Sequence, residues 1–516
     1  MARFTKLMRR KISLNRLILI YFALSAVSMG GYLLASYTYY RIGFPLDDAW
    51  IHQTYARNLV QYGEWSFIHG QPSAGSTAPL WSALLAMGVS LGSGPYLWTY
   101  LLGLASLALM GVIGYIGFGE ISTSPASWGI FAGVILIMEW HLVWGAASGM
   151  ETLTFALIVL IFFVVLMRIK GRTNSEEASH SSSVPDLKGW LGLGLLAGLS
   201  VWLRPDGVTL LGPLGLVISF LDLGWRQKLK VFLIGLGGFV LLFGPYLAFN
   251  QLLAGDWWPN TFYAKQAEYA ALRSSPLLWR FLGEFSLPLI GVGVIILPGF
   301  AYLMWRSVRS KSWGVIAGCL WILGYMLMYA WRLPVTYQHG RYLIPAMPLF
   351  FLLGFAGLSE IARPRSLVLW KRVLSRSWII TLGAVACIFW GIGARAYARD
   401  VAVIESEMVN TAQWISGNIE PEALIAAHDI GAIGYFSHHN LLDLAGLVSP
   451  QVIPFIRNQE ALKVFLDENK ADYLVTFPDW YPELVKGSTM IFSSGGVYSP
   501  SEGGENMAVY CWNDFK

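Results

Sequence analysis

The chain carries little charge for its length. Only 13% of its 516 residues are Asp, Glu, Lys or Arg, about half of the roughly 25% that is typical of soluble domains. Apolar and aromatic residues make up 55%, and the mean hydropathy is +0.53. This balance excludes a disordered chain, a fibre and an ordinary soluble enzyme. Several apolar runs approach or exceed the roughly 18–20 residues that cross a bilayer, so the sequence predicts a mainly α, polytopic membrane protein.

Cysteine is also scarce. Cys319, Cys387 and Cys511 are the three cysteines, too few and too scattered for a disulfide framework or a thiolate metal site. The sequence shows no internal repeat and no nucleotide-binding glycine signature, and nothing in it indicates a nucleic-acid partner. What the chain does must therefore be read from the segments between its apolar spans.

Charge divides the chain into two parts. Residues 1–394 hold 29 basic and 15 acidic residues, whereas residues 395–516 hold 7 and 16. In the acidic part, strand-like segments alternate with helical ones, which is typical of a parallel or mixed sheet. We therefore expect a multi-span membrane domain over 1–394 and a small α/β domain over 395–516.

The basic residues of the first part predict the orientation. Of these 29 residues, 21 lie in five segments: 1–16, 168–188, 222–230, 306–312 and 360–378. By the positive-inside rule these segments are cytoplasmic. The N-terminus is then cytoplasmic, residues 39–78 form the first external loop, and the C-terminal domain lies outside a cell membrane that the chain crosses many times.

The expected path has about 11 full spans and one irregular stretch. Segments 79–91 and 96–118 are expected to form an out–in–out pair. Segment 127–148 must then begin and end outside, and we interpret it as two half-helices broken near Met138–His141. Non-helical backbone at membrane depth requires burial in protein or contact with water.

The first external loop contains a pair of acidic residues. Asp47 and Asp48 open an amphipathic helix with an apolar stripe at i, i+4 and i+8, which is expected to lie in the membrane plane at the outer surface. Asp48 and His52 share another face of this helix. Asp is a preferred N-cap, and capping explains one carboxylate better than it explains two.

Six short segments resemble one family. They are PLDDAWIHQTYARNL (45–59), GQPSAGSTAPLW (70–81), ASGMET (147–152), RPDG (204–207), PNTFYAK (259–265) and HGRYLIP (339–345). Together they resemble the GT-C glycosyltransferases that use polyprenyl-phosphate sugars, closest to arabinofuranosyltransferase-like and protein-mannosyltransferase-like members. The resemblance implies transfer of a sugar, with inversion, to a cell-envelope glycan, lipid or protein on the extracytoplasmic face.

Such a reaction needs a base for the acceptor hydroxyl and a carboxylate near an oxocarbenium-like transition state. By resemblance, a loop-1 aspartate is catalytic, either Asp47 or Asp48. Asp47 is slightly favoured because it precedes the helix proper, whereas Asp48 can pair with His52. Glu151 is a second acidic candidate, although a glutamate near a helix N-terminus is also favoured by the helix dipole.

The leaving phosphate needs cationic or hydrogen-bonding partners. For the phosphate we favour Arg57, Lys265, His339 and Arg341. The other candidates for substrate binding are His52, Asn260, Tyr263 and Tyr342. Alternatives stay open: Arg341 can snorkel to the interface, and the segment around Asn260 can be a turn with an interfacial aromatic residue.

Three other groups of polar residues have simpler interpretations. Arg204 and Asp206 are expected to form a local ion pair in a short loop, and a turn at His428–Asp429 is favoured over an acceptor site. The histidines lack paired metal-ligand spacing, so a dedicated metal site formed by His52, His69 and Asp48 is not favoured. No cofactor is predicted, and a divalent cation between carboxylates and phosphate stays open.

The alternative function is a transporter or flippase of lipid-linked sugars. Transporters often contain inverted repeats and place their ionisable residues near the midplane of the membrane. Here the acidic residues of the membrane part lie mostly in loops, and Glu139 is the exception. The sequence therefore favours an enzyme, with membrane lipids, a polyprenyl-phosphate sugar and an envelope acceptor as its partners.

Overall fold

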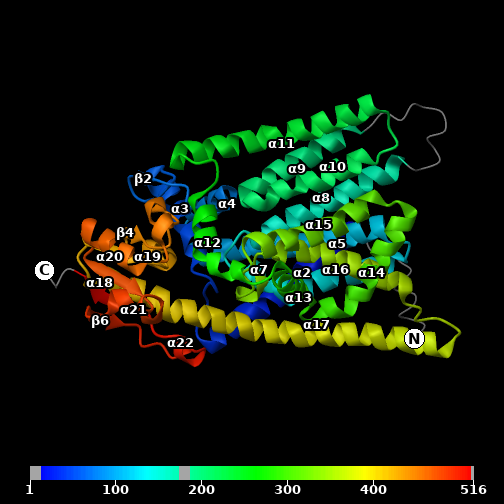
Figure 1. The fold of residues 1–516 in the computed structure, drawn as a ribbon. Helices are drawn as coiled ribbons and strands as arrows, with labels where there is room; N and C mark the ends of the chain where they lie inside the picture. Colours follow the sequence, from blue (N-terminus) through cyan, green and yellow to red (C-terminus); the bar gives the residue numbers. More distant parts are fainter. Residues whose placement is uncertain (1–12, 174–185, 513–516) are drawn as a thin grey trace.

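The computed structural model describes residues 13–173 and 186–512. The basic residues 1–12 and nearly all of the polar stretch 173–184 lie outside the described residues. Within the described part, apolar helices run roughly alongside one another, and the C-terminal region lies at one end of this bundle (Figure 1). The fold is therefore mainly α with a small α/β region, as the sequence predicts.

Seven segments of the described chain are long and apolar enough to cross a membrane. They contain α2 (Leu14–Tyr39), α5 (Pro95–Ile121), α8 (Thr152–Thr173), α11 (Trp225–Ala254), α15 (Trp313–Arg332), α16 (Met347–Ile361) and α17 (Leu369–Ile404). Two bent pairs can each form one further span: α6 (Ala126–Met138) with α7 (Trp140–Ala147), and α13 (Leu277–Ser286) with α14 (Val292–Ser310). Shorter apolar helices complete the bundle: α9 (Leu187–Leu203) and the η2–α10 segment (Pro205–Leu210, Leu211–Ser219).

The predicted break near Met138–His141 is confirmed. Helices α6 and α7 meet at Glu139 with a bend of 53°. Glu139 is the N-cap of α7, and its Oε2 accepts a hydrogen bond of 3.1 Å from the backbone N–H of Leu142. Its Oε1 lies 2.8 Å from Nδ1 of His141. A capping carboxylate thus satisfies the amides that the break exposes.

The predicted out–in–out pair is wrong. Helix α4 (Pro79–Ser90) has 12 residues, about 18 Å of helix, and is too short for a hydrocarbon core of about 30 Å. Helix α5 begins beside the first loop, where Gln53 Nε2 donates to Thr99 Oγ1 at 2.8 Å. At its far end, Arg306 Nη2 donates to the Ile121 carbonyl at 3.0 Å. Helix α4 therefore stays at the loop end, α5 crosses the bundle once, and α6–α7 returns as one broken span.

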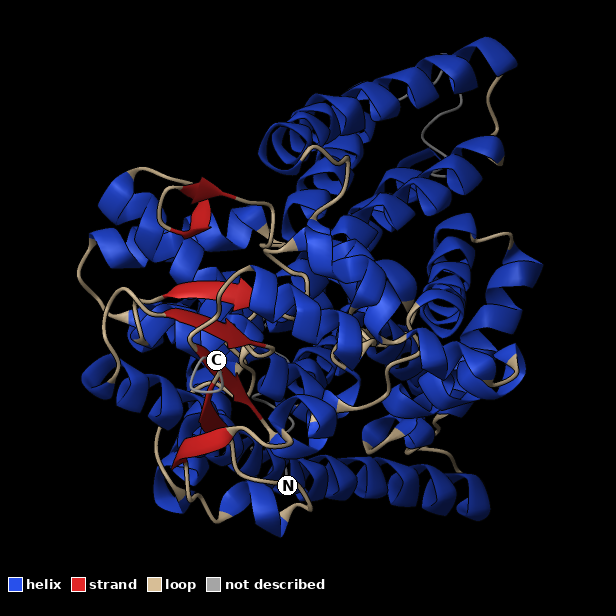
Figure 2. Ribbon diagram, turned by 60° about the vertical axis from the view of Figure 1, so that its left-hand side comes forward, coloured by secondary structure: helices blue, strands red, loops and turns tan. Residues whose placement is uncertain are grey.

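The C-terminal region forms a five-stranded mixed sheet in the order β4-β3-β5-β7-β6. The strands are β3 (Leu424–Ala427), β4 (Asn440–Asp443), β5 (Tyr473–Thr476), β6 (Thr489–Ser493) and β7 (Ala508–Cys511). Strands β3, β4 and β5 are parallel, and β7 pairs antiparallel with β5 and β6. Helices α18 (Asn410–Asn418), α19 (Gly431–Phe436) and α20 (Gln459–Glu468) lie around the sheet (Figure 2). The predicted α/β character is confirmed.

A continuous helical segment joins the membrane part to this sheet. Helix α17 continues through a π-helical turn at Glu405–Val409 into α18. Glu405 anchors the turn, because its Oε2 lies 2.7 Å from Arg41 Nε and its Oε1 accepts from the Tyr96 hydroxyl at 3.1 Å. Helix α17 passes residue 394 without interruption, so the backbone does not mark a boundary there. The division into 1–394 and 395–516 therefore remains a proposal drawn from composition.

The first loop is covered by the C-terminal region. Helix α3 (Asp48–Tyr62) is buried on most of its circumference and packs against α4 and α19. Its Trp50 lies 4.9 Å from the ring of Tyr435 and 4.6 Å from that of Phe436. More of the surface of α3 is therefore buried than its single apolar stripe predicts. Part of the surface that covers α3 comes from residues more than 370 positions away in the chain. The remaining elements at the end of the bundle that carries the first loop include β1 (Ser66–Ile68), β2 (Gln71–Pro72) and α12 (Asn260–Glu268).

Candidate active site

Two cavities meet at the start of α3. The first, which we call the acidic cavity, has a volume of about 750 Å³ and is lined by loop 1, α12 and the C-terminal region. The second, the apolar cavity, has about 480 Å³ and is lined mainly by residues from the membrane part. Both are lined by Asp48, Ile51, Lys265, Arg341 and Leu447. The shared charged residues mark the point where a polar and an apolar compartment adjoin.

Asp48 lies between two cations at this junction. Its Oδ2 accepts from Lys265 Nζ at 3.0 Å and from Arg341 Nη2 at 2.7 Å. Burial by itself raises the pKa of Asp48, but Lys265 and Arg341 outweigh it and hold this pKa well below its usual range. The carboxylate is therefore ionised, and its side chain is still 24% exposed.

Arg341 has hydrogen-bonding capacity to spare. Its Nε and Nη1 are buried and have no hydrogen-bond partner among the residues that the structure describes, while Nη2 donates to Asp48 and to the Tyr342 hydroxyl at 3.1 Å. The Lys265 ammonium lies 5.8 Å from the centre of the Tyr342 ring. A guanidinium with three available N–H donors on two nitrogens, beside an ammonium, is a suitable receptor for a phosphate.

Asp47 has a different environment from its neighbour. Its two carboxylate oxygens accept from the backbone N–H groups of Gly431 (2.7 Å) and Ala432 (2.8 Å), at the start of α19. Burial, with the nearby Asp429, raises the pKa of Asp47 to about 8. Gly431 permits this approach, because a Cβ there would collide with the Asp47 carbonyl oxygen. Asp47 thus caps a helix of the C-terminal region rather than its own helix.

Glu151 and His52 line the apolar cavity. Glu151 Oε1 accepts from Arg204 Nη1 at 3.3 Å, and its Oε2 lies 3.5 Å from His52 Nε2. The predicted Arg204–Asp206 ion pair is confirmed, with 3.1 Å between Nε and Oδ1. Arg204 also donates to the Tyr329 hydroxyl at 2.8 Å. The arginine therefore does more than shape a turn, because it holds Glu151 at the cavity wall.

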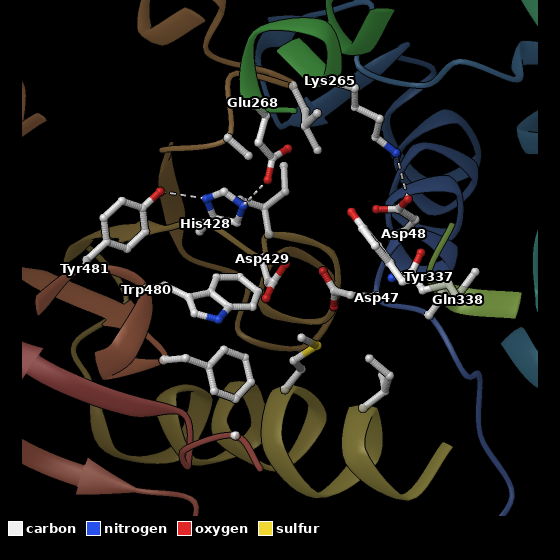
Figure 3. A pocket seen from close by; sticks show the side chains of 18 of the residues that line it. Asp47, Asp48, Lys265, Glu268, Tyr337, Gln338, His428, Asp429, Trp480 and Tyr481 are labelled. Carbon is white, nitrogen blue, oxygen red and sulfur yellow. Dashed lines mark hydrogen bonds and ion pairs between the residues drawn. The ribbon is translucent and has the colours of Figure 1, made fainter. Parts of the chain in front are cut away.

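The C-terminal region supplies a group of polar and aromatic side chains to the acidic cavity (Figure 3). His428 Nε2 lies 3.3 Å from Glu268 Oε1, and its Nδ1 lies 2.7 Å from the Tyr481 hydroxyl. Asp429 points toward Asp47 in Figure 3, and its Oδ2 is buried with no hydrogen-bond partner in residues 13–173 and 186–512. Burial raises the pKa of Asp429 to about 6, with nearby carboxylates adding to the shift and His428 opposing it.

These residues were not selected from the sequence, which favoured a turn at His428–Asp429. The chain bends at His428, directly after β3, and Trp480 lies four residues after the end of β5. One feature of the sequence could have indicated these residues, namely their position just after predicted strands. The carboxyl ends of adjacent parallel strands share one edge of a sheet, where α/β folds bind ligands.

Four candidates lie away from both cavities: Arg57, Asn260, Tyr263 and His339. Arg57 donates to the carbonyls of Tyr435 and Gly434 and so ties α3 to α19. His339 Nε2 lies 2.8 Å from Asp400 Oδ2. The Asn260 backbone N–H donates to the Ala74 carbonyl at 3.2 Å. The other seven candidates line at least one cavity: Asp47, Asp48, His52, Glu151, Lys265, Arg341 and Tyr342.

Within residues 13–173 and 186–512, no three His, Cys, Asp or Glu side chains are grouped so that they could hold a metal ion. The carboxylates nearest the junction already have partners. Asp48 faces two cations, and both oxygens of Asp47 accept backbone N–H groups.

Solved structures share this architecture over nearly the whole chain. ArnT from Cupriavidus metallidurans, solved bound to undecaprenyl phosphate, is 15% identical, with 95% of this chain and 97% of that chain covered and a TM-score of 0.62. The oligosaccharyltransferase of Archaeoglobus fulgidus is 12% identical over 91% and 70% of the two chains, with a TM-score of 0.61. The mycobacterial arabinofuranosyltransferase AftD is 14% identical over 94% and 41%, with a TM-score of 0.50.

These likenesses establish the GT-C fold that the sequence motifs predict. Residues 395–510 match a family described as "Domain of unknown function (DUF8728)". A comparison with curated proteins found no match.

Proposed function

We propose that the chain is an integral membrane glycosyltransferase that moves a sugar from a polyprenyl-phosphate donor to a cell-envelope acceptor. The observation that carries this proposal is the position of Asp48, which lies where the two cavities meet and is paired with Lys265 and Arg341. A base is thus adjacent to two cations that suit a leaving phosphate. The reaction requires these two functions side by side.

In the proposed step, the acceptor hydroxyl oxygen forms a bond to the anomeric carbon of the donor. The bond from that carbon to the phosphate oxygen breaks, and its electron pair leaves with the lipid phosphate. The hydroxyl proton passes to Asp48, and the configuration inverts because attack and departure occur on opposite faces. Arg341 and Lys265 stabilise the charge that develops on the departing phosphate.

The same cations explain how Asp48 can act as a base. A carboxylate with a strongly lowered pKa is a weak proton acceptor. When a phosphate draws the hydrogen bonds of Lys265 and Arg341 to itself, Asp48 loses the partners that depress its pKa. Donor binding would therefore raise the basicity of Asp48 at the moment when the base is needed.

The apolar cavity is the proposed site of the polyprenyl chain near its phosphate. Trp258, Phe262, Met328 and Trp331 are among the residues that line it, and apolar walls suit an isoprenoid. One solved neighbour binds undecaprenyl phosphate, and the archaeal oligosaccharyltransferase was solved with a dolichol-phosphate. Both facts concern those proteins and support, by fold, the same class of donor here.

Asp47 is proposed to position the site rather than to accept the proton. Its oxygens are engaged by two backbone amides of α19, which fixes the start of α3 against the C-terminal region. Glu151, held by Arg204, is proposed to place a second negative charge near the donor sugar. The orientation proposed from charge, with loop 1 and the C-terminal region outside, places both cavities on the extracytoplasmic side.

The test uses purified protein in lipid nanodiscs with a panel of radiolabelled polyprenyl-phosphate sugars and a membrane extract as acceptor. Label should move from the lipid to an acceptor with the parental protein and not with Asp48→Asn. Asp256→Asn is the matched control, because Asp256 is exposed in the loop after α11. Movement of intact lipid-linked sugar across the bilayer, without cleavage, would instead support a flippase.

A further inference from the structure

The acidic cavity lies at the carboxyl edge of the three parallel strands of the C-terminal sheet. His428 and Asp429 follow β3, Leu447 lies shortly after β4, and Trp480 follows β5, and all four line the cavity. Ligands of open α/β sheets bind beyond the carboxyl ends of their strands. The DUF8728-matching region thus presents its binding edge to the junction of the two cavities.

The wall formed by this edge is partly aromatic. The Trp480 side chain is 44% exposed and meets the His428 ring edge-on, with 5.2 Å between ring centres and an interplanar angle of 86°. The Phe477 ring lies 5.0 Å from the Trp480 ring, tilted by 42° to it. An exposed indole held between two neighbouring rings is a fixed apolar platform, and the C–H face of a pyranose or furanose ring suits such a surface.

Polar groups beside the platform provide both donors and acceptors. Asp429 Oδ2 has no hydrogen-bond partner within the described part of the chain, while His428 Nδ1 and the Tyr481 hydroxyl lie 2.7 Å apart. A sugar hydroxyl donates and accepts, so it can engage a carboxylate and a phenol or imidazole together. The unpartnered Asp429 oxygen is the atom that a bound hydroxyl group would satisfy.

The charge of this wall argues against an anionic acceptor. Glu268, Asp429, Asp479 and Glu505 line the acidic cavity, and Lys265 and Arg341 lie at its junction with the apolar cavity. Arg457 is a further cation in the lining, and its guanidinium donates to the Glu268 carbonyl. A phosphate or carboxylate near Trp480 would face carboxylates and would be drawn toward the junction instead. An uncharged, polyhydroxylated ligand suits the Trp480 side.

We infer that the Trp480–Asp429–His428 group is an acceptor subsite for a neutral sugar ring. This assignment rests on the proposed function and deepens it, since it makes the acceptor a glycan whose terminal sugar is held by the C-terminal region. The donor is held by Lys265 and Arg341 on the other side of Asp48. The two substrates thus enter from different cavities, and Asp48 lies where they meet.

The experiment measures saccharide binding without any donor, so that it does not depend on transfer. Full-length protein in nanodiscs is titrated with neutral gluco-, manno-, galacto- and arabino-oligosaccharides and observed by saturation-transfer NMR. At least one sugar should bind, and Trp480→Ala and Asp429→Asn should each weaken its binding by about tenfold or more. Trp480→Phe should retain most of the binding.

Two matched controls should leave saccharide binding unchanged: Trp225→Ala, an exposed indole at the opposite end of the bundle, and Glu460→Gln, an exposed carboxylate on α20. Polyprenyl-phosphate binding, measured in parallel, should be unaffected by Trp480→Ala and reduced by Lys265→Ala. If the parental protein binds polyprenyl phosphate but none of the saccharides, this subsite is overturned and the proposed function still stands.

Three results would contradict the acceptor assignment. They are the absence of binding by every sugar of the panel, equal binding by the parental protein and Trp480→Ala, and binding of neutral peptides in place of saccharides. The last would indicate a protein acceptor. If the parental protein binds saccharides but does not bind polyprenyl phosphate, the result would instead contradict the proposed donor.

Discussion

The two cavities differ in where their walls come from. The apolar cavity is built mainly from the membrane part, by segments whose motifs are visible in the sequence: ASGMET, RPDG, PNTFYAK and HGRYLIP each contribute. The acidic cavity takes much of its wall from residues 403–505, which carry none of these motifs. The proposed donor chemistry thus uses segments with motifs that are visible in the sequence, whereas the proposed acceptor chemistry uses the region that matches DUF8728.

The adjacent residues Asp47 and Asp48 show the same contrast on a smaller scale. Asp48 faces cations from the membrane part, and Asp47 faces backbone amides from the C-terminal region. One peptide bond separates a proposed base from a proposed positioning residue. The predictions below test that contrast.

The largest effect is expected for Asp48→Asn. Removal of the base should lower the rate of transfer about 10²–10⁴-fold, while the fold persists because Asn has nearly the same shape. The measurement is the initial rate of label transfer at saturating donor, beside the thermal midpoint. Parental rates in Asp48→Asn together with a large loss in Asp47→Asn would reverse the two roles.

The second-largest effect is expected for Arg341→Ala. Loss of its contacts with the phosphate should lower kcat/KM for the donor about 10²–10³-fold. Arg341→Lys should recover part of the loss, since charge remains but the paired N–H geometry does not. Arg273→Ala serves as control, because Arg273 is an exposed arginine of η3 (Ala270–Ser274) and lines neither cavity. Equal donor kinetics for Arg341→Ala and the control would remove Arg341 from the site.

Asp47→Asn should mainly affect stability. One amide oxygen replaces two acceptors, so a buried backbone N–H loses its partner at a cost of about 1–3 kcal/mol. The thermal midpoint should fall, and transfer should fall far less than in Asp48→Asn. A stable Asp47→Asn protein that is inactive would contradict the positioning role.

A smaller effect concerns Asp429 and pH. Its folded-state pKa, raised to about 6 chiefly by burial, lies above the unfolded value, so the folded state binds its proton more tightly. This contribution to stability is complete below about pH 4 and is lost as pH rises through about 6. Asp429→Asn should therefore raise the thermal midpoint at pH 8 relative to the parental protein and leave it nearly unchanged at pH 4. A stabilisation that is equal at both pH values would contradict a raised pKa.

The fold could be predicted largely from the sequence, because hydropathy and the distribution of Lys and Arg report directly on membrane spans. The break at Glu139 was visible as a polar residue inside an apolar run. Helix α4 was misassigned because its 12 residues are as apolar as a span, and composition does not reveal that its partners lie at the loop end of the bundle.

The site could be predicted only in part. Lys265 and Arg341 can be predicted from short motifs between the apolar spans, but their pairing with one particular aspartate depends on tertiary geometry. His428, Asp429 and Trp480 were missed as a group because they are brought together by strand order, which a single sequence does not specify. Arg57 was selected for its charge, and the structure instead places it at the α3–α19 contact.

The most direct test of the central claim measures polyprenyl-phosphate binding by Asp48→Asn. The account holds that Lys265 and Arg341 bind the lipid phosphate and that Asp48 competes with it for them. Loss of the carboxylate should therefore leave the affinity unchanged or raise it a few-fold, roughly 1 kcal/mol or less, in a protein that no longer transfers sugar. Loss of lipid-phosphate binding together with transfer would contradict the account, because Asp48 would then be part of the binding site rather than its base.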